Sequence, residues 1–189
     1  MAALPDLPAG AAAGARLAWR PVRRPYGPHE QSAAGRRAAA AALAAAGSAR
    51  RTVPGGPGGG RPDFPPGFAG SISHTQRLAV ALVVPGAAAV GVDAESAEIA
   101  PRVARFVLRE QERNMLLAPA GEYAARDLFS AKEAAFKALS GIAGTGDFLF
   151  WRIELTRSGD ALTASYRDVA VPVWIRSTED LSFAVAILR

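Results

Sequence analysis

The sequence of 189 residues has no cysteine, only two histidines and only two lysines. The lack of cysteine excludes disulfide bonds, thiolate zinc sites and cysteine nucleophiles. Because His29 and His74 are too few for a histidine-built metal centre, any metal must be held by carboxylates. No apolar run approaches the roughly 20 residues of a membrane-spanning helix, and the N-terminus lacks the basic-then-apolar order of a secretory signal. We expect a globular cytoplasmic protein with no membrane contact.

The charge is unevenly distributed along the chain, whose net charge is +5. Residues 1–90 hold 10 Arg and Lys against 3 Asp and Glu (+7), whereas residues 91–189 hold 12 against 14 (−2). A basic first half suits an anionic ligand such as a nucleotide phosphate or a nucleic acid, and it also suits simple solubility. The two lysines, Lys132 and Lys137, lie close together in a chain that otherwise uses arginine, which suggests a need for a compact ammonium group there.

The first third of the chain predicts one long helix between irregular segments. Residues 1–28 are rich in Ala, Pro and Arg without clear periodicity, which predicts an irregular arm with a strand near residues 17–19. Residues 32–46 are nearly all alanine, which predicts a helix. Residues 54–60 read as a flexible glycine loop, and residues 61–67 as a stiff, turn-rich segment.

The rest of the chain predicts strands, then helices, then strands. Residues 77–84 and 88–92 flank a Pro-Gly turn and predict a hairpin. Helical periodicity predicts one or two helices over residues 103–117 and another over residues 127–139. The remaining β-branched and aromatic segments predict four strands, at residues 148–156, 161–166, 171–175 and 181–188.

A short internal similarity suggests that the chain contains two related lobes. Leu-Ala-Val-Ala-Leu at residues 78–82 matches Phe-Ala-Val-Ala-Ile at residues 183–187. With the repeated order of a helix followed by strands, this match predicts an α+β fold of two similar lobes in a pseudo-two-fold arrangement, each an antiparallel sheet packed with helices. We expect lobes at residues 1–90 and 91–189, with the active site at their interface.

Two pairs of charged residues have spacings that suit a metal or a phosphate. Asp93 and Glu95 are two apart at the end of a strand, so both carboxylates project from one face and can converge on a hard cation. Glu133 and Lys137 are four apart on one helix face. Each pair also has an ordinary interpretation, the first as a solvated acidic turn and the second as a surface salt bridge of about 0.3–0.5 kcal/mol.

The basic first half contains further candidates for phosphate binding. His74 follows Ser-Ile-Ser, and a histidine among small hydroxyls is either a phosphate ligand or a turn residue. Arg36 and Arg37 lie on the alanine-rich helix, where both could be solvent charges. We expect Arg37 to be one.

Together these segments resemble a known family. Gly91-Val-Asp-Ala-Glu95, followed by Phe129-Ser-Ala-Lys-Glu-Ala-Ala-Phe-Lys137, is similar to the paired signature of 4'-phosphopantetheinyl transferases, G-[IV]-D-x-E and [FW]-S-x-K-E-[AS]-x-x-K. Gly35-Arg36 and residues 61–74 resemble the surfactin and enterobactin synthase type, in which two lobes are fused in one chain. The resemblance covers residues from about 30 to the C-terminus.

The resemblance implies transfer of phosphopantetheine from coenzyme A to a serine of an apo acyl or peptidyl carrier protein. By that similarity Asp93, Glu95 and Glu133 hold Mg²⁺, whose preference is for oxygen ligands. Glu133 accepts the proton of the carrier serine, directly or through a metal-held water. Lys137 contacts the pyrophosphate and neutralises the leaving oxygen.

The same resemblance assigns the coenzyme A contacts to the basic first half. It places Arg36 and His74 on the 3'-phosphate, with Ser73 helping, and Arg61 near the adenine. Two fused lobes also imply a functional monomer.

The segment at residues 103–117 is the expected docking site for an acidic carrier protein. Arg105, Arg109 and Arg113 are four apart there, and the same row also suits a solvated helix face.

Three alternative functions remain open from the residues alone. A magnesium-dependent phosphodiesterase or nuclease could use the same carboxylates and lysine, although a second metal cluster is lacking. A non-catalytic nucleic-acid binder could use the basic half, but few aromatic residues lie among its arginines, so we expect no nucleic-acid partner. A degenerate transferase could bind coenzyme A without turnover. The pathway, whether fatty acid, polyketide or nonribosomal peptide synthesis, is not indicated.

Overall fold

The computed structural model describes residues 4–55, 61–140, 142, 150–159 and 161–189. They form two antiparallel sheets, one of three strands in the order β1-β3-β2 and one of five in the order β4-β8-β7-β6-β5. The strands are β1 (Arg16–Pro21), β2 (Phe68–His74), β3 (Leu78–Pro85), β4 (Ala89–Glu95), β5 (Glu154–Ser158), β6 (Ala161–Tyr166), β7 (Val169–Ser177) and β8 (Ser182–Leu188). The helices are α1 (Ala9–Ala12), α2 (Pro28–Ala45), α3 (Pro101–Val107), α4 (Glu110–Met115), α5 (Ala125–Leu139) and the short 3-10 helix η2 (Phe150–Arg152).

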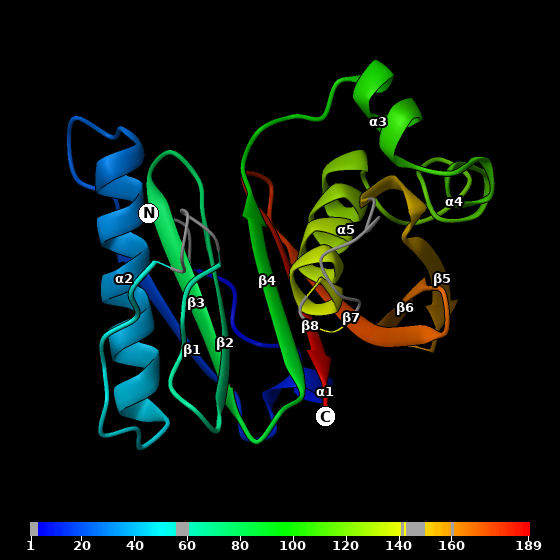
Figure 1. Cartoon of the computed structure of the whole chain (residues 1–189). Helices are drawn as coiled ribbons and strands as arrows, with labels where there is room; N and C mark the ends of the chain where they lie inside the picture. The colour runs from blue at the N-terminus through cyan, green and yellow to red at the C-terminus, as the bar shows by residue number, and fades with distance from the viewer. Residues whose placement is uncertain (1–3, 56–60, 141, 143–149, 160) are drawn as a thin grey trace.

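Helix α2 covers one face of the three-stranded sheet, at the left of Figure 1. Its alanines let the helix lie close to the strands, and a Cβ added at Gly35 would come within 2.7 Å of Ile72 on β2. Ala38, Ala42 and Leu43 are fully buried against β3. The close packing therefore depends on the small side chains that also make the segment a strong helix.

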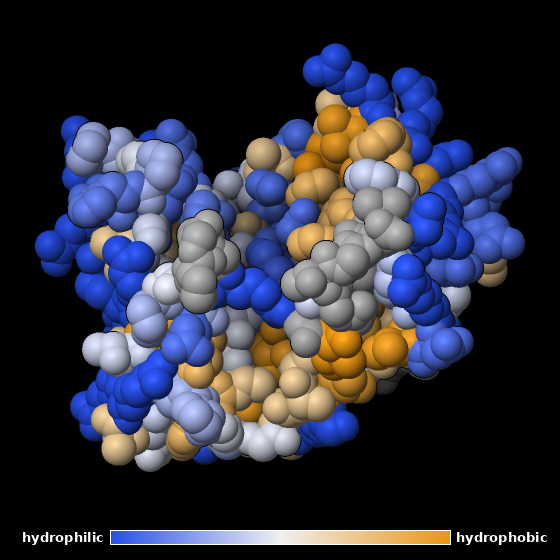
Figure 2. Space-filling view, viewed as in Figure 1, coloured by the Kyte–Doolittle hydropathy of each residue, from blue (hydrophilic) through white to orange (hydrophobic). Residues whose placement is uncertain are grey.

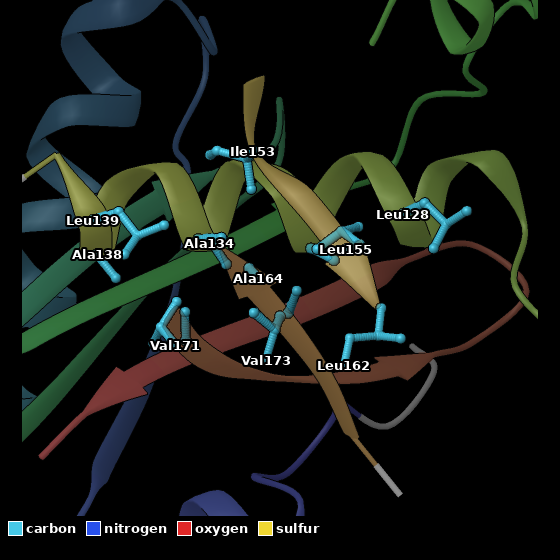
Figure 3. Close-up of a cluster of buried hydrophobic side chains, with 14 of the residues drawn as sticks. Leu128, Ala134, Ala138, Leu139, Ile153, Leu155, Leu162, Ala164, Val171 and Val173 are labelled. Atoms are coloured by element: carbon cyan, nitrogen blue, oxygen red, sulfur yellow. The ribbon is translucent and has the colours of Figure 1, made fainter. Parts of the chain in front are cut away.

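Helix α5 covers the five-stranded sheet in the same way. Figure 3 shows apolar side chains of α5 facing those of β5, β6 and β7. The interior residues that the figure labels are Leu128, Ala134, Ala138, Leu139, Ile153, Leu155, Leu162, Ala164, Val171 and Val173. This cluster is the largest core of the molecule, and it fixes α5 on the sheet.

The sheet faces turned away from the two helices share a third core. Val80 and Leu82 of β3 lie in it together with Val185 and Ile187 of β8. The two segments that match in sequence are thus inner strands that contribute to one common core. Each sheet has its own helix on one face and the shared core on the other.

The two sheets meet along the edges of β2 and β4, which are not paired by backbone hydrogen bonds in the described residues. Serine hydroxyls of β2 take the place of a ladder. Ser71 Oγ accepts the amide of Val92 at 3.1 Å, and Ser73 Oγ accepts that of Ala94 at 3.4 Å. We call this line of contact the seam. It satisfies two edge amides that would otherwise be buried without a partner.

A fully buried ion pair joins α5 to the segment around α3 and α4. Lys132 Nζ lies 2.7 Å from Glu112 Oε2 and donates to the carbonyls of Val107 and Ile153, both at 2.8 Å. The side chains of Lys132 and Glu112 are 0% and 1% exposed. Glu112 also accepts the amide of Leu155 at 2.7 Å. Every donor of the ammonium therefore has an acceptor.

The structure confirms the predicted α+β fold, with two antiparallel sheets packed with helices. The predicted hairpin is wrong, because β3 pairs with β1 and β2 whereas β4 pairs with β8. The strand expected near residues 17–19 is confirmed as β1, whereas α1 and β2 were not predicted. Of the expected strand at residues 148–156, residues 148–149 lie outside the described chain, and the strand begins at Glu154 after η2. Within the described residues, no helix combines the length and apolarity needed to cross a membrane.

The buried pair predicts a large effect of removing one partner only. Lys132→Met should leave the Glu112 carboxylate buried without a cation and lower the free energy of unfolding by about 3–5 kcal/mol, measured by urea denaturation. The double variant Lys132→Met/Glu112→Gln should recover part of that loss because it buries no charge. Equal losses in the two variants would show that the unpaired carboxylate is not the cause.

Candidate functional site

Lys137 lies at the seam and contacts both lobes. Its Nζ is 2.7 Å from Asp93 Oδ1, 3.1 Å from the carbonyl oxygen of Val92 and 3.2 Å from Ser73 Oγ. The ammonium comes from α5, Asp93 and Val92 from β4, and Ser73 from β2. Lys137 therefore forms its salt bridge with Asp93, and not with Glu133 as the spacing on the helix suggested.

Asp93 is the second member of this network. Ser73 Oγ donates to Asp93 Oδ1 at 2.8 Å, the same oxygen that Lys137 contacts. The Asp93 side chain is only 9% exposed. The structure thus brings together three predicted site residues, Ser73, Asp93 and Lys137, at the interface of the two sheets.

Glu133 lies one helical turn before Lys137, at the edge of the core. Burial raises the pKa of its carboxyl group above the usual value, the charge of Lys137 opposes the rise, and the negative charges of Asp93 and Glu95 add to it. The three carboxylates are therefore close enough to repel one another. No group of three His, Cys, Asp or Glu side chains in the described chain has a geometry ready for a metal ion. The donor set nevertheless fits Mg²⁺ chemically, because it is all oxygen and a cation would relieve this repulsion.

Gly91 explains how α5 comes so close to the strand that carries the acidic residues. Gly91, Asp93 and Glu95 alternate along β4, so they share one face of the strand. A Cβ added at Gly91 would lie 1.8 Å from the carbonyl oxygen of Ala134 on α5. Glycine is therefore required for this contact, and the contact sets the distance between β4 and Lys137.

A cavity of about 330 Å³ opens beside the seam in the first lobe. Arg36 and His74 both line it, with Gln31 and Ser32 of α2. The pKa of His74 is lowered, first by partial burial and then by the charge of Lys137, so His74 lies within electrostatic reach of the network. The two residues expected to bind one phosphate thus face one cavity.

Arg61 and Ser73 do not line this cavity. The guanidinium of Arg61 donates to the backbone carbonyl of Lys137, so it ties the first lobe to the C-terminal part of α5. Ser73 belongs to the seam network instead of the cavity wall.

Arg37, which was expected to be a solvent charge, is half-buried on α2. A second cavity of about 580 Å³ is lined by Arg36, Arg37 and Arg51. Arg37 Nη2 is buried and has no hydrogen-bond partner among the described residues. Arg51 was not predicted to line a cavity, because it lies in the loop after α2 and only the fold brings it back toward the helix. The sequence signal that could have indicated these residues was the excess of arginine in residues 1–90.

The row of Arg105, Arg109 and Arg113 does not form one helix face. The helix breaks at Leu108, so Arg105 lies on α3 and Arg113 on α4, with Arg109 as the cap between them. Arg109 pairs with Glu154 at 3.0 Å and donates to the carbonyl of Arg152, and Arg113 donates to the carbonyls of Arg105 and Leu108. Arg113 therefore stabilises the turn between α3 and α4, and Arg109 joins that turn to η2 and β5.

Comparison with known protein families gives two matches. Residues 29–84 match the family described as the 4'-phosphopantetheinyl transferase N-terminal domain. Residues 89–187 match the 4'-phosphopantetheinyl transferase superfamily, and this match covers more than half of the chain. No curated protein matches the sequence.

The close contact between Gly91 and α5 predicts that a side chain at this position displaces the helix and destabilises the whole protein. Gly91→Ala should force α5 away from β4, separate Lys137 from Asp93 and lower the free energy of unfolding by about 1–3 kcal/mol, as overpacking usually does. Gly27→Ala is the matched control, because nothing lies within 4 Å of a Cβ at that position. Thermal unfolding measures both variants, and equal melting temperatures would contradict the steric argument.

Proposed function

Since the chain belongs to the 4'-phosphopantetheinyl transferase superfamily, we propose that it is of the surfactin and enterobactin synthase type and acts on a serine of an apo acyl or peptidyl carrier protein. The observation that carries this proposal is the placement of the arginine- and histidine-lined cavity directly beside the seam network of Ser73, Asp93 and Lys137. An anionic cofactor held in the cavity would present its reacting phosphate to that network. The match of both family domains within one chain supports the two-lobed type.

The first lobe would bind the nucleotide of coenzyme A. Arg36 and His74 line the nearer cavity and supply donors for the 3'-phosphate, and charged donors make the strongest hydrogen bonds to phosphate. Arg37 lines the adjoining cavity together with Arg36, and it is a natural addition to the same set. The +7 charge of residues 1–90 favours the binding of the whole anion.

Asp93, Glu95 and Glu133 would hold Mg²⁺. When bound, the ion would draw negative charge away from the pyrophosphate oxygens and so favour its cleavage. Lys137 neutralises Asp93 in the ligand-free protein, and all three of its N–H groups have acceptors. To contact the pyrophosphate, Lys137 must exchange one of these acceptors for a phosphate oxygen. Its position between Asp93 and Ser73 makes that exchange a short movement.

The proposed chemistry is a displacement at the β-phosphorus of coenzyme A. The serine oxygen of the carrier forms a bond to phosphorus while the pyrophosphate bond breaks, which releases adenosine 3',5'-bisphosphate. Glu133 would take the serine proton, directly or through a water. The positive charge of Lys137 would stabilise the leaving oxygen.

Three features of the protein beyond the reaction are part of the same proposal. A single chain contributes both the cavity and the seam network, which supports a monomer. The absence of cysteine is compatible with a cytoplasmic enzyme. The carrier can belong to fatty acid, polyketide or nonribosomal peptide synthesis.

The transfer reaction predicts a mass change in the acceptor. An apo carrier protein incubated with this protein, coenzyme A and Mg²⁺ should gain the mass of one phosphopantetheine group, detected by intact-mass spectrometry. The gain should disappear with a chelator and with Glu133→Ala, because both remove part of the proposed metal and base set. Glu179→Ala is the control, since Glu179 is an exposed acid in the turn between β7 and β8 and is not one of the proposed ligands.

The outcome also separates the alternatives. Release of adenosine 3',5'-bisphosphate without carrier modification would favour a phosphodiesterase. Coenzyme A binding without either product would indicate a degenerate transferase. Failure to modify carriers from all three kinds of pathway, together with binding to DNA or RNA, would contradict the proposal and favour a nucleic-acid binder.

The arginine-lined cavities predict discrimination between coenzyme A and its 3'-dephospho form. Arg36→Ala, Arg37→Ala and His74→Ala should each raise the KM for coenzyme A about tenfold or more, as expected for the loss of a charged hydrogen bond. The KM for 3'-dephospho-coenzyme A should hardly change. Arg20→Ala, an exposed arginine on β1, is the matched control. A similar rise for both substrates would contradict recognition of the 3'-phosphate.

A further inference from the structure

The larger of the two arginine-lined cavities contains three guanidinium groups and, among the described residues, no carboxylate. Its volume is about 580 Å³, and it is lined by Ala33, Arg36, Arg37 and Ala40 of α2 and by residues 51–54 of the loop that follows. The four α2 residues are three and four positions apart, so they share one face of the helix. We call this space the triple-arginine cavity. It is built from two segments that only the fold brings together.

The positive charge of the triple-arginine cavity is not neutralised by acidic side chains of the described chain. The first lobe contains only three acidic residues. Two of them, Glu30 and Asp63, contact other basic side chains, and the third, Asp6, does not line the cavity. Figure 2 shows mostly hydrophilic residues over the part of the first lobe where Figure 1 places α2. Like charges that are held together without counter-charges attract an anion.

Arg36 connects this cavity to the smaller one that also contains His74. Arg36 lines both cavities, as do Val53 and Pro54. Its Nη1 donates to Ser32 Oγ at 2.5 Å, and Ser32 lines only the smaller cavity. A guanidinium group has five N–H donors, so most of those of Arg36 are free for an anion in either cavity. Two anions that share this one cation would repel each other.

Arg51 distinguishes the two cavities. Its side chain is exposed and lines only the triple-arginine cavity, and the proposed coenzyme A contacts do not include it. Thr52 follows Arg51 and adds a hydroxyl group to the same wall. Guanidinium groups from two different segments can donate to one phosphate from several directions, because each presents a planar fork of N–H groups. The cavity therefore has the donors of a phosphate site that Arg51 completes.

We propose that Arg51, Arg36 and Arg37 form a second anion site, which takes a free phosphate or sulfate dianion from solution. This site differs from the proposed 3'-phosphate site of Arg36 and His74, and its existence does not depend on the transferase function. Its coupling to coenzyme A rests on that function. Because Arg36 serves both cavities, a dianion in the triple-arginine cavity weakens the binding of coenzyme A, and coenzyme A weakens the binding of the dianion by the same factor.

Calorimetric titration of the full chain with inorganic phosphate, without coenzyme A or Mg²⁺ and at constant ionic strength, tests the site directly. We expect saturable binding by the wild type and binding about tenfold weaker or more in Arg51→Ala, as the loss of a charged hydrogen bond predicts. Arg51→Lys should lose less, because it keeps the charge without the planar fork. Arg20→Ala is the matched control, since Arg20 is an exposed arginine that lines neither cavity.

Titration with coenzyme A in the presence and absence of phosphate tests the coupling. Saturating phosphate or sulfate should raise the Kd of the wild type for coenzyme A about fivefold or more, whereas chloride at equal ionic strength should not. The Kd for 3'-dephospho-coenzyme A should hardly change, because this ligand has no 3'-phosphate that competes for Arg36. In Arg51→Ala the effect of the same phosphate concentration should largely disappear, and in Arg20→Ala it should remain. Thermal unfolding of the variants should match the wild type, since both side chains are exposed.

Three results would overturn the proposal. Absence of saturable phosphate binding would exclude the site. Equal phosphate binding by the wild type and Arg51→Ala would place the anion elsewhere. Weaker binding of coenzyme A, but not of its 3'-dephospho form, by Arg51→Ala without added phosphate would assign the cavity to the 3'-phosphate of coenzyme A itself. A wild-type protein that binds phosphate through Arg51 but modifies no carrier protein would support the anion site and contradict the transferase function alone.

Discussion

The hydrogen-bonded contact between Lys137, Asp93 and Ser73 is the interaction on which the arrangement of the molecule depends. It joins α5, β4 and β2 at the line where the two sheets meet. The same atoms that hold the lobes together therefore lie at the proposed reaction centre. Two constraints make the contact possible: Gly91 lets α5 approach β4, and Gly35 lets α2 approach β2. The two glycines thus allow the close packing of helices on strands that brings Lys137, Asp93 and Ser73 together.

The second lysine has a different role. Lys132 is fully buried and holds three segments together, whereas Lys137 is partly accessible and contacts the site. An arginine could hardly replace Lys132, because a planar guanidinium does not fit three acceptors converging on one point. Because the rest of the chain uses arginine as its basic residue, the presence of lysine at these two positions was informative. It marked two positions where a compact cation has several acceptors around it, one in the buried ion pair and one at the seam.

Local patterns in the sequence predicted the long helices, the C-terminal strands and the charged residues of the motifs. They failed where the structure depends on distant parts of the chain. Strand β2 has Ser71 and Ser73 where β-branched residues are usual, and their hydroxyl groups make contacts with β4 that no local pattern reveals. The expected hairpin failed because the chain leaves one sheet at Pro85 and enters the other at Ala89. The cavity between Arg37 and Arg51 was not predicted either, because it depends on a loop that folds back on α2.

The seam differs from an ordinary sheet in one respect that bears on motion. A backbone ladder fixes two strands at every second residue, whereas here two hydroxyl groups and one ammonium group connect β2 to β4. Rotating one lobe against the other would break these side-chain contacts and would also disturb the apolar core that β3 and β8 share, although neither sheet would lose a strand pairing. Side chains alone therefore join the two sheets, polar ones at the seam and apolar ones in the core between the sheets, so the position of one lobe against the other is set by packing and not by a continuous backbone ladder.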